Sequence, residues 1–174
     1  MKMFVAVLTA LALPSMALAG APEPRRAIDI DRFMGRWYEI VRTPNDGQKN
    51  CHAASQVWSQ RPDGTFDIAQ TCRKGSPNGP VRKVDTRARI LDPKTNAKFE
   101  ASFFGGLLKR KYWVIDRSDD YDWMIASTSD GDFVALLARE PGMPHGDVSA
   151  LIRRMRALGF TANKLEVVAG ASRP

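Results

Sequence analysis

Along most of the chain, short runs of alternating hydrophobic and polar residues are separated by turn-forming residues at intervals of roughly a dozen positions. Such alternation is typical of β-strands that have one face in a core, and the spacing favours an all-β barrel or sandwich. Asp-Gly pairs between two alternating runs, as in Pro62–Gly64, indicate hairpins. The pattern predicts strands at residues 36–43, 53–61, 65–73, 82–91, 97–104, 110–116, 122–129 and 132–138.

One segment near the C-terminus changes to a helical period. Residues 147–159 place their apolar side chains on a single face, with three arginines off it. Asp147 is the expected N-cap and Gly159 the expected C-cap of this helix. The apolar stripe consists of Val148, Leu151, Ile152, Met155 and Leu158.

Eight strands in meander order followed by one amphipathic helix predict an all-β fold. Specifically, they predict an eight-stranded antiparallel up-and-down β-barrel with one C-terminal α-helix packed outside. Closure removes the exposed edges that an open sheet of this size would carry. A short helical turn at 29–35 and a short strand at 163–168 are expected before and after this core. A barrel of this size can hold one small ligand.

The first residues predict export. Lys2, an apolar run over Phe4–Leu13 and the small residues of Ala17–Ala19 form a cleavable secretory signal peptide at 1–19. No cysteine follows it, so a soluble periplasmic or secreted protein is expected rather than a lipoprotein. The expected remainder is a flexible lead, the folded domain and a flexible tail, at 20–28, 29–168 and 169–174 respectively.

The charge pattern argues against a nucleic-acid partner. The chain has 26 Lys and Arg against 19 Asp and Glu, a formal net charge of +7, but the charges are scattered singly. A solvated basic surface is the favoured interpretation, and peripheral attraction to an anionic membrane is a secondary one.

Export gives the two cysteines a role, because disulfides persist outside the cytoplasm. A Cys51–Cys72 bridge is predicted, with two buried free thiols as the alternative. A regular hairpin at Pro62–Gly64 would place residue 55 opposite Cys72, so the bridge requires a bulge or irregular lead-in before Ala53.

No catalytic or metal-binding constellation is visible. His52 and His145 have no metal-ligand spacing with each other, and neither a CxxC nor an HExxH motif occurs. His52 follows Cys51 directly, but neighbours in a strand point to opposite faces, which disfavours a Cys–His pair. The sequence therefore predicts no metal, no cofactor and no enzyme.

Three separated motifs resemble those of the lipocalins, in particular the group of the bacterial outer-membrane lipocalin and apolipoprotein D. They are "GRWYEI" (Gly35–Ile40), "DDYDW" (Asp119–Trp123), in which Asp119 replaces the usual threonine, and "LLAREP" (Leu136–Pro141). The likeness covers residues 29–168, and the motifs occur in the family's order and spacing. It implies that Trp37 lies across the closed end of the barrel and that Arg139 packs on its ring as a cation–π pair.

Strand alternation then gives a set of inward, ligand-binding positions. The alanines among them leave room in the lumen or merely fit the taper of the barrel. In the strand at 122–129 either Trp123 or Met124 can face inward, and Thr86 and Ser127 are further inward candidates. The predicted cavity residues are Glu39, Val41, Ala54, Gln56, Trp58, Phe66, Ile68, Gln70, Ala88, Ile90, Phe99, Ala101, Phe103, Tyr112, Val114, Ile125, Ala135 and Leu137.

The resemblance implies a monomeric or homodimeric carrier of a small hydrophobic ligand, a fatty acid or lysophospholipid, for lipid transport, storage or envelope maintenance. Two alternatives stay open. One is a lipocalin-fold enzyme acting on a lipidic or small hydrophobic substrate through Glu39, Tyr112 or a free cysteine. The other is a filled barrel that acts through surface contacts. The role of Glu39, structural hydrogen bonding or ligand recognition, is the sharpest open question.

Overall fold

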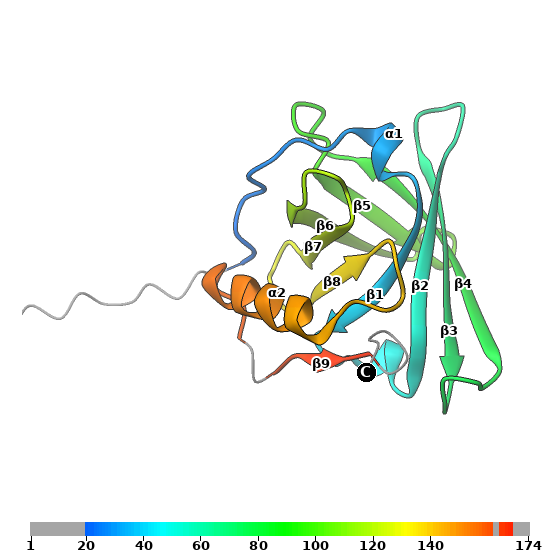
Figure 1. The fold of residues 1–174 in the computed structure, drawn as a ribbon. Coiled ribbons are helices and arrows are strands. Elements are labelled where there is room, and N and C mark those ends of the chain that lie inside the picture. Colours follow the sequence, from blue (N-terminus) through cyan, green and yellow to red (C-terminus); the bar gives the residue numbers. More distant parts are fainter. Residues whose placement is uncertain (1–19, 162–163, 169–174) are drawn as a thin grey trace, which may run out of the picture.

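The computed structural model describes residues 20–161 and 164–168, so the predicted signal peptide and tail lie outside the described residues. Eight strands curve into a barrel, and a ninth short strand joins its wall (Figure 1). The strands are β1 (Gly35–Arg42), β2 (Cys51–Gln60), β3 (Phe66–Lys74), β4 (Val81–Ile90), β5 (Lys98–Phe103), β6 (Leu108–Arg117), β7 (Trp123–Thr128), β8 (Val134–Ala138) and β9 (Glu166–Val167).

The strand order confirms the predicted fold class. Each strand from β2 to β8 pairs antiparallel with the next, β8 pairs with β1, and a further β1–β2 pairing closes the barrel. The order is therefore the predicted up-and-down meander. Strand β9 pairs with β1 at Val41 and Arg42, where β1 no longer pairs with β2.

Antiparallel order fixes which loops share an end of the barrel. The β1–β2, β3–β4, β5–β6 and β7–β8 connections lie at one end, here called the open end. Two of these connections contain short 3-10 helices, η1 (Asp46–Gln48) and η2 (Phe104–Gly106). At the opposite end, here called the floor, α1 (Ile30–Phe33) precedes β1. Asp29 caps α1 by accepting a hydrogen bond from the backbone N–H of Arg32, and Phe33 is buried.

The segment predicted as a flexible lead runs along the barrel between its two ends (blue in Figure 1). The N–H of Ala21 donates to the carbonyl of Ser129 at 3.1 Å, and the N–H of Ile28 donates to the carbonyl of Thr95 at 2.7 Å. Ser129 follows β7 at the open end, whereas Thr95 precedes β5 at the floor.

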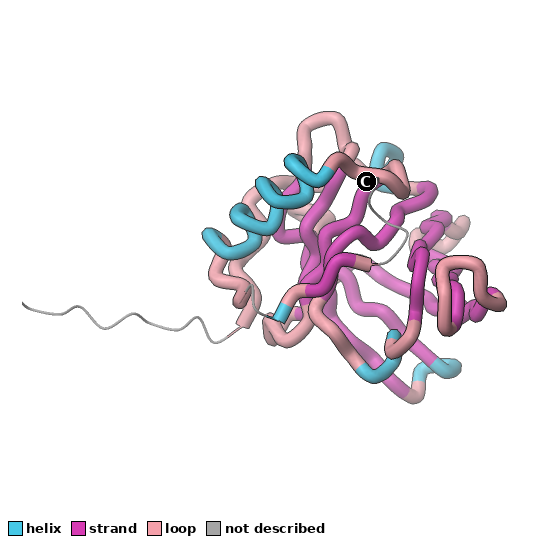
Figure 2. The backbone as a smooth tube through the Cα atoms, turned by 60° about the horizontal axis from the view of Figure 1, so that its bottom comes forward, coloured by secondary structure: helices cyan, strands magenta, loops and turns pink. Residues whose placement is uncertain are grey.

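Helix α2 (His145–Ala157) lies outside the barrel, as predicted, but it begins earlier than expected (Figure 2). The prediction of Asp147 as N-cap is wrong: Pro144 occupies the N-cap position, and its carbonyl accepts from the N–H groups of Asp147 and Val148. Asp147 instead lies in the first turn, where its negative charge interacts favourably with the positive end of the helix dipole. The helix ends before Gly159, which has the left-handed φ of +98°.

Two apolar clusters follow from this arrangement. One fills the barrel at the floor and includes Phe33, Trp37, Phe66 and Phe99. The other lies largely outside the barrel, where the stripe of α2 packs on outward residues of β1, β7 and β8. Strand β8 contributes to both clusters and is buried at all five positions.

The predicted disulfide is confirmed: Cys51 and Cys72 are bridged, with Cα atoms 5.4 Å apart. The required irregularity is present, because the β2–β3 register shifts between His52 and Ser55. Within this shift Ala53 has a φ of +45°, and Ala54 is buried in the same cluster as the two cysteines. The bulge thus brings the start of β2 within bonding distance of β3.

Removing the bridge should destabilise the barrel by about 3 kcal/mol, because a bridge between cysteines 21 positions apart restricts the unfolded chain. We expect urea unfolding of Cys51→Ser/Cys72→Ser to show this loss against the oxidised wild type. Treating the wild type with a reductant should reproduce it. An unchanged unfolding midpoint in the double variant would contradict a stabilising role for the bridge.

Candidate functional site

The floor of the barrel is sealed by Trp37 and Arg139. The guanidinium of Arg139 lies 3.7 Å from the centroid of the Trp37 ring, the arrangement that the resemblance implied. Arg139 also donates to the carbonyls of Arg32 and Arg36, and the Trp37 indole N–H donates to the carbonyl of Phe33 at 2.9 Å. These bonds connect β8, β1 and α1 across the end of the barrel.

Above this seal, aromatic rings fill the floor half of the lumen. Phe99 is the centre of the group: its ring stacks on Phe33 at a centroid distance of 5.5 Å and meets Trp58 and Phe66 edge-on at 5.2 and 5.9 Å. Phe66 and Phe99 are at most 1% exposed. A ligand in the lumen would therefore have to lie nearer the open end.

The middle of the lumen is lined by small side chains. Ala88 of β4 is the cross-strand partner of Ala101 of β5, and Ala126 of β7 is the partner of Ala135 of β8. Partners across an antiparallel ladder share a face. Their neighbours Phe66, Phe99 and Leu137 are in the barrel cluster, so both alanine pairs face the lumen.

Nearer the open end the inward residues become more polar and more exposed. Strand alternation, counted from the aromatic residues at the floor, places four half-buried side chains on the inner face. They are Gln56, Gln70, Phe103 and Tyr112. Gln70 donates to the hydroxyl of Thr86 at 2.9 Å. Burial raises the pKa of the Tyr112 phenol, which therefore stays protonated and able to donate a hydrogen bond.

Trp58 has an unsatisfied donor between these two regions. Its side chain is 8% exposed, and its indole N–H has no hydrogen-bond partner among the described residues. A buried donor without an acceptor is costly, so an acceptor brought by a ligand would be favoured there.

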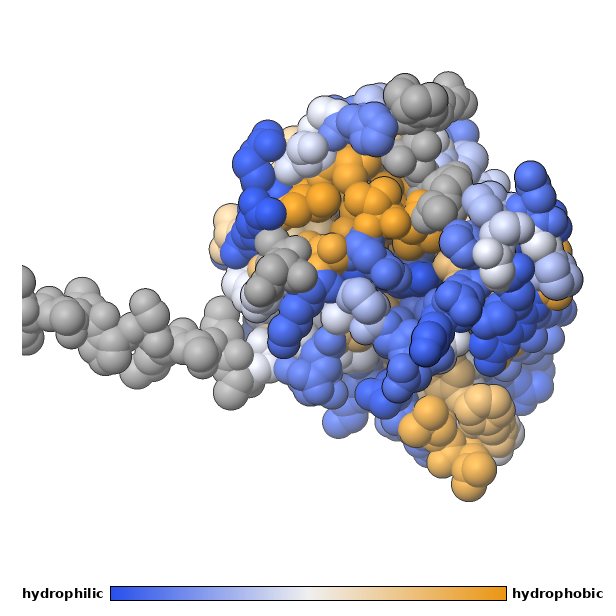
Figure 3. All heavy atoms as spheres, turned by 90° about the horizontal axis from the view of Figure 1, so that it is seen from below, coloured by the Kyte–Doolittle hydropathy of each residue, from blue (hydrophilic) through white to orange (hydrophobic). Residues whose placement is uncertain are grey.

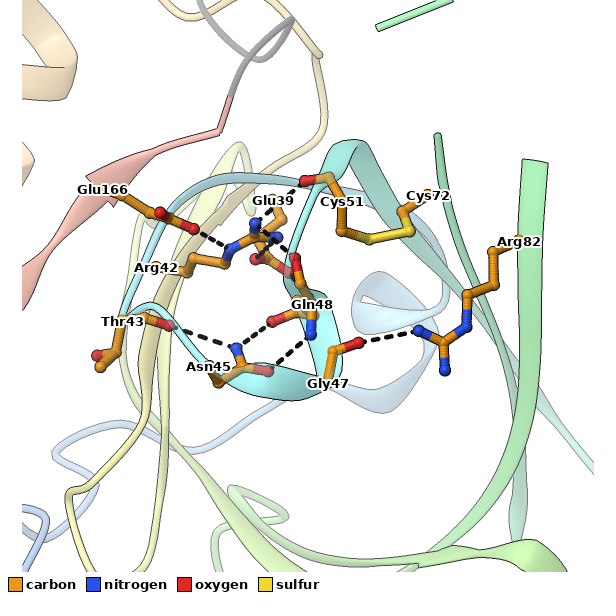
Figure 4. Close-up of polar contacts among 10 residues, drawn as sticks. All are labelled: Glu39, Arg42, Thr43, Asn45, Gly47, Gln48, Cys51, Cys72, Arg82 and Glu166. Carbon is orange, nitrogen blue, oxygen red and sulfur yellow. Dashed lines mark hydrogen bonds and ion pairs between the residues drawn. A yellow bond between two sulfur atoms is a disulfide. The ribbon is translucent and has the colours of Figure 1, made fainter. Parts of the chain in front are cut away.

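A buried ionic network joins β1 to the η1 loop at the open end (Figure 4). Arg42 donates to Glu39 at 3.1 Å, to Glu166 of β9 at 2.7 Å and to the carbonyls of Gln48 and Cys51. The second carboxylate oxygen of Glu39 accepts from the side-chain amide of Gln48 at 2.8 Å.

The η1 loop is anchored on both of its sides. Asn45 accepts from the N–H of Gln48 at 3.0 Å, which fixes the turn from within. Across the open end, Arg82 of β4 donates to the carbonyl of Gly47 at 3.0 Å. The loop is therefore tied to β1 through Arg42 and to the opposite wall through Arg82.

Glu39 takes part in two of these contacts. Burial raises its pKa above the usual 4.5, although Arg42 and the Gln48 hydrogen bond act in the opposite direction. A raised pKa is the property that the enzyme alternative requires, but both carboxylate oxygens already have partners. Of the other groups named for the enzyme alternative, a free cysteine is absent because both cysteines are in the disulfide, whereas Tyr112 lies half-buried on the inner face. Glu39 therefore accepts hydrogen bonds from Arg42 and Gln48, and a contact between Glu39 and a ligand stays a prediction.

Two of the predicted cavity residues, Val41 and Ile125, are wrong, and so is the further inward candidate Ser127, which shares the outer face of β7 with Ile125. The β1–β8 register shifts between Glu39 and Val41, so Val41 pairs with Leu136 and faces outward, while Arg42 takes the inward position. In β7, Met124 pairs with the inward Leu137, so Met124 and Ala126 face the lumen. Ile125 consequently lies in the outer cluster under α2, and Trp123 packs against that same cluster.

The remaining predicted lumen positions lie on the inner face by register, apart from Ala54 at the bulge. Whether they bind a ligand stays a prediction. Sequence reasoning left Met124 as one of two candidates and missed Arg42, Ala126 and Arg110, the last of which is opposite the inward Ala101. Two consecutive apolar residues, Ile40 and Val41, were the available sign that alternation breaks in β1.

A groove also lies outside the barrel, between α2 and the floor ends of β7 and β8, with a volume of about 590 Å³. It is lined by residues such as Trp123, Arg139, Met143 and Leu151. No cluster of His, Cys, Asp and Glu within residues 20–161 and 164–168 could hold a metal ion. None of the helices in the part of the chain described is long and apolar enough to cross a membrane.

A closed meander barrel with a cation–π seal, an aromatic floor and an outer helix defines a class of small-molecule-binding proteins. A family model described as a lipocalin-like domain matches residues 28–170, and the chain belongs to the lipocalin family. Members of this family bind small hydrophobic ligands and are generally binding or transport proteins.

Curated relatives include mouse apolipoprotein D, 26% identical over 100% of this chain and 97% of its own length. The outer membrane lipoprotein Blc of Escherichia coli K12 is 26% identical over 94% of this chain and 95% of its own.

Solved structures with the same fold include two arthropod proteins. Insecticyanin from the tobacco hornworm has a TM-score of 0.65 at 15% identity, covering 84% of this chain and 82% of its own. Lobster apocrustacyanin A1 has a TM-score of 0.62 at 13% identity, covering 89% of this chain and 93% of its own. At such low identity the likeness supports the fold alone.

Proposed function

We propose that this lipocalin is exported and holds a single-chain lipid, a fatty acid or lysophospholipid, in the upper half of its lumen. The observation that carries the proposal is the pair of alanine partners, Ala88–Ala101 and Ala126–Ala135, above an aromatic floor. Small residues on two walls leave width for an acyl chain, and the floor rings give its end an apolar contact.

The polar end of such a lipid has partners higher in the barrel. Arg110 and Tyr112 alternate along the inner face of β6 toward the open end, and a guanidinium beside a phenol suits a carboxylate or a phosphodiester. The indole N–H of Trp58 offers a further donor deeper in the lumen. An amphiphile fits this gradient of polarity better than a purely apolar molecule does.

The location and role are part of the same proposal. The signal-peptide pattern at residues 1–19 and relatives named as outer membrane lipoproteins support a role in lipid transport, storage or envelope maintenance. We place the protein in the periplasm or outside the cell on this basis.

A larger side chain in the middle of the lumen tests the proposal. Ala101→Trp should reduce the affinity for a fluorescent fatty acid by at least about tenfold, because the indole would occupy the space of the acyl chain. The matched control is Ser102→Trp, which adds the same side chain on the outer face of β5 and should bind normally. Urea unfolding of both variants separates lost affinity from lost folding.

Two results would overturn the proposal. One is a wild-type protein that binds neither the fluorescent fatty acid nor a lysophospholipid in native mass spectrometry. The other is equal affinity in Ala101→Trp and the wild type, because a ligand whose affinity is unchanged by an indole at position 101 does not bind beside that residue.

A further inference from the structure

The connection between β5 and β6 exposes three large apolar side chains together. Phe104 is 69% exposed, Leu107 89% and Leu108 42%, and all lie within five consecutive residues. Single exposed apolar residues are ordinary, but several at one loop tip indicate an interaction surface. We call residues 103–111 the β5–β6 tip.

The backbone of the tip departs from the strand conformation at Phe104 and at the two glycines that follow it. Phe104 has a φ of +52°, which a bulky residue rarely adopts, and Gly105 and Gly106 follow at +67° and +102°. Phe104 follows the inward Phe103, so alternation already places its ring away from the lumen, and the positive φ ends β5 at this point. The chain thus adopts an unfavourable local conformation that keeps an aromatic ring in solvent.

Cations follow the apolar residues immediately. Lys109, Arg110 and Lys111 follow Leu108 at the start of β6, with Arg110 on the lumen side and the two lysines on the outer face. The tip is at the open end, where Lys49, Lys74 and Arg82 also lie in or beside the other connections. Figure 3 shows a hydrophobic protrusion at one edge, separated by hydrophilic residues from a second hydrophobic area. Asp46, Asp130 and Asp132 are at the same end, so acidic groups are present there but are fewer than the cations named above.

Exposed apolar residues next to cations favour a lipid bilayer over a second protein chain as the partner of the tip. A stable dimer buries about 800 Å² per partner over a well-packed patch, whereas three side chains on a protruding tip offer much less. A protrusion with apolar residues at its end and lysines directly behind it matches a bilayer surface. There the apolar groups enter the acyl boundary and the cations reach the phosphates of anionic lipids.

We propose that the β5–β6 tip docks the open end of the barrel on anionic lipid bilayers. Phe104 and Leu107 insert, and Lys109 and Lys111 contact the headgroups. The inference does not depend on what the lumen binds.

Flotation with vesicles tests the proposal. The wild type should bind vesicles of phosphatidylcholine mixed with phosphatidylglycerol, and bind poorly to phosphatidylcholine alone or at high salt. Phe104→Ser/Leu107→Ser should reduce partitioning at least about tenfold, since two apolar groups lose their transfer into lipid. Lys109→Gln/Lys111→Gln should reduce it about tenfold on anionic vesicles only.

Two matched controls locate the effect. Arg153→Gln/Arg156→Gln removes the same charge from the exposed face of α2, and Val167→Ser removes an exposed apolar side chain from β9. Both should bind vesicles like the wild type. All substitutions are at exposed positions, and unchanged urea midpoints would show that each variant is folded.

Three outcomes would overturn the inference. They are no binding of the wild type to anionic vesicles, equal losses in the tip and control variants, and a dimer that Phe104→Ser/Leu107→Ser converts to a monomer without any vesicle binding. Binding of the fluorescent fatty acid is measured in parallel. Intact fatty-acid binding with absent vesicle binding would reject the docking surface and leave the lumen function standing.

Discussion

Replacing Arg42 by Met is expected to lower the free energy of unfolding by about 3 to 5 kcal/mol at pH 8. The side chains of Arg42 and Glu39 are only 5% and 11% exposed, so removing the cation leaves a buried carboxylate without compensating charge. The carbonyls of Gln48 and Cys51 also lose their donor, which adds a cost independent of pH.

The pH dependence identifies the buried charge as the cause. Burial already raises the pKa of Glu39 in the wild type, and Arg42 opposes that rise. Folding therefore favours protonated Glu39, so its contribution to stability is present below the unfolded pKa of about 4.5 and is lost as pH rises through the folded pKa. Without Arg42 the folded pKa rises further, and the defect should shrink as the pH falls toward 5.

Urea unfolding between pH 5 and pH 8 measures this effect. Arg42→Met/Glu39→Gln should recover much of the stability at pH 8, because the buried charge is gone. Arg89→Met, which breaks the exposed pair with Glu100, should leave the unfolding midpoint nearly unchanged. A defect in Arg42→Met that is the same at both ends of the pH range would contradict this explanation.

The second large effect is expected at the centre of the aromatic floor. Phe99→Ala should destabilise the barrel by about 3 to 5 kcal/mol, because it removes a fully buried ring that contacts Phe33, Trp58 and Phe66. The same change at an exposed ring, Phe104→Ala, should cost little. Denaturant unfolding compares the two.

The floor substitution also has a consequence for binding. The cavity left by Phe99→Ala opens toward the alanine-lined middle of the lumen, so the variant should accept longer acyl chains than the wild type. Fluorescent fatty acids of increasing length, tested in both proteins, measure this.

A loss of stability below about 1 kcal/mol in Phe99→Ala would contradict the stability prediction, since it would mean that neighbouring rings collapse into the space.

Much of the fold follows from the sequence pattern. Alternation places Phe66 and Phe99 inside, because each is in a strand whose other face is polar or more exposed. Turn residues fix the hairpins, and the apolar stripe of α2 fixes its packing face. These features depend on local periodicity, which is readable from residue types alone.

The site is less predictable for two physical reasons. A bulge such as the one at Ile40 moves every later residue of the strand to the opposite face. As a result Arg42, and not Val41, is on the inner face of β1. In β7 and β8 the outer face is covered by α2, so both faces are apolar. Alternation then does not show which residues point into the lumen. The Glu39–Arg42–Gln48 network combines a bulged strand with a loop, which residue spacing alone does not bring together.

The position of β9 bears on when the barrel can form. Strand β1 is made first, yet its edge at Val41 and Arg42 is completed by Val167 and Glu166, close to the end of the described chain. The Arg42 side chain, which spans the gap where β1 leaves β2, needs Glu166 as well. Contacts so distant in sequence are slow to form. The chain therefore completes its wall only when nearly all of it has been released.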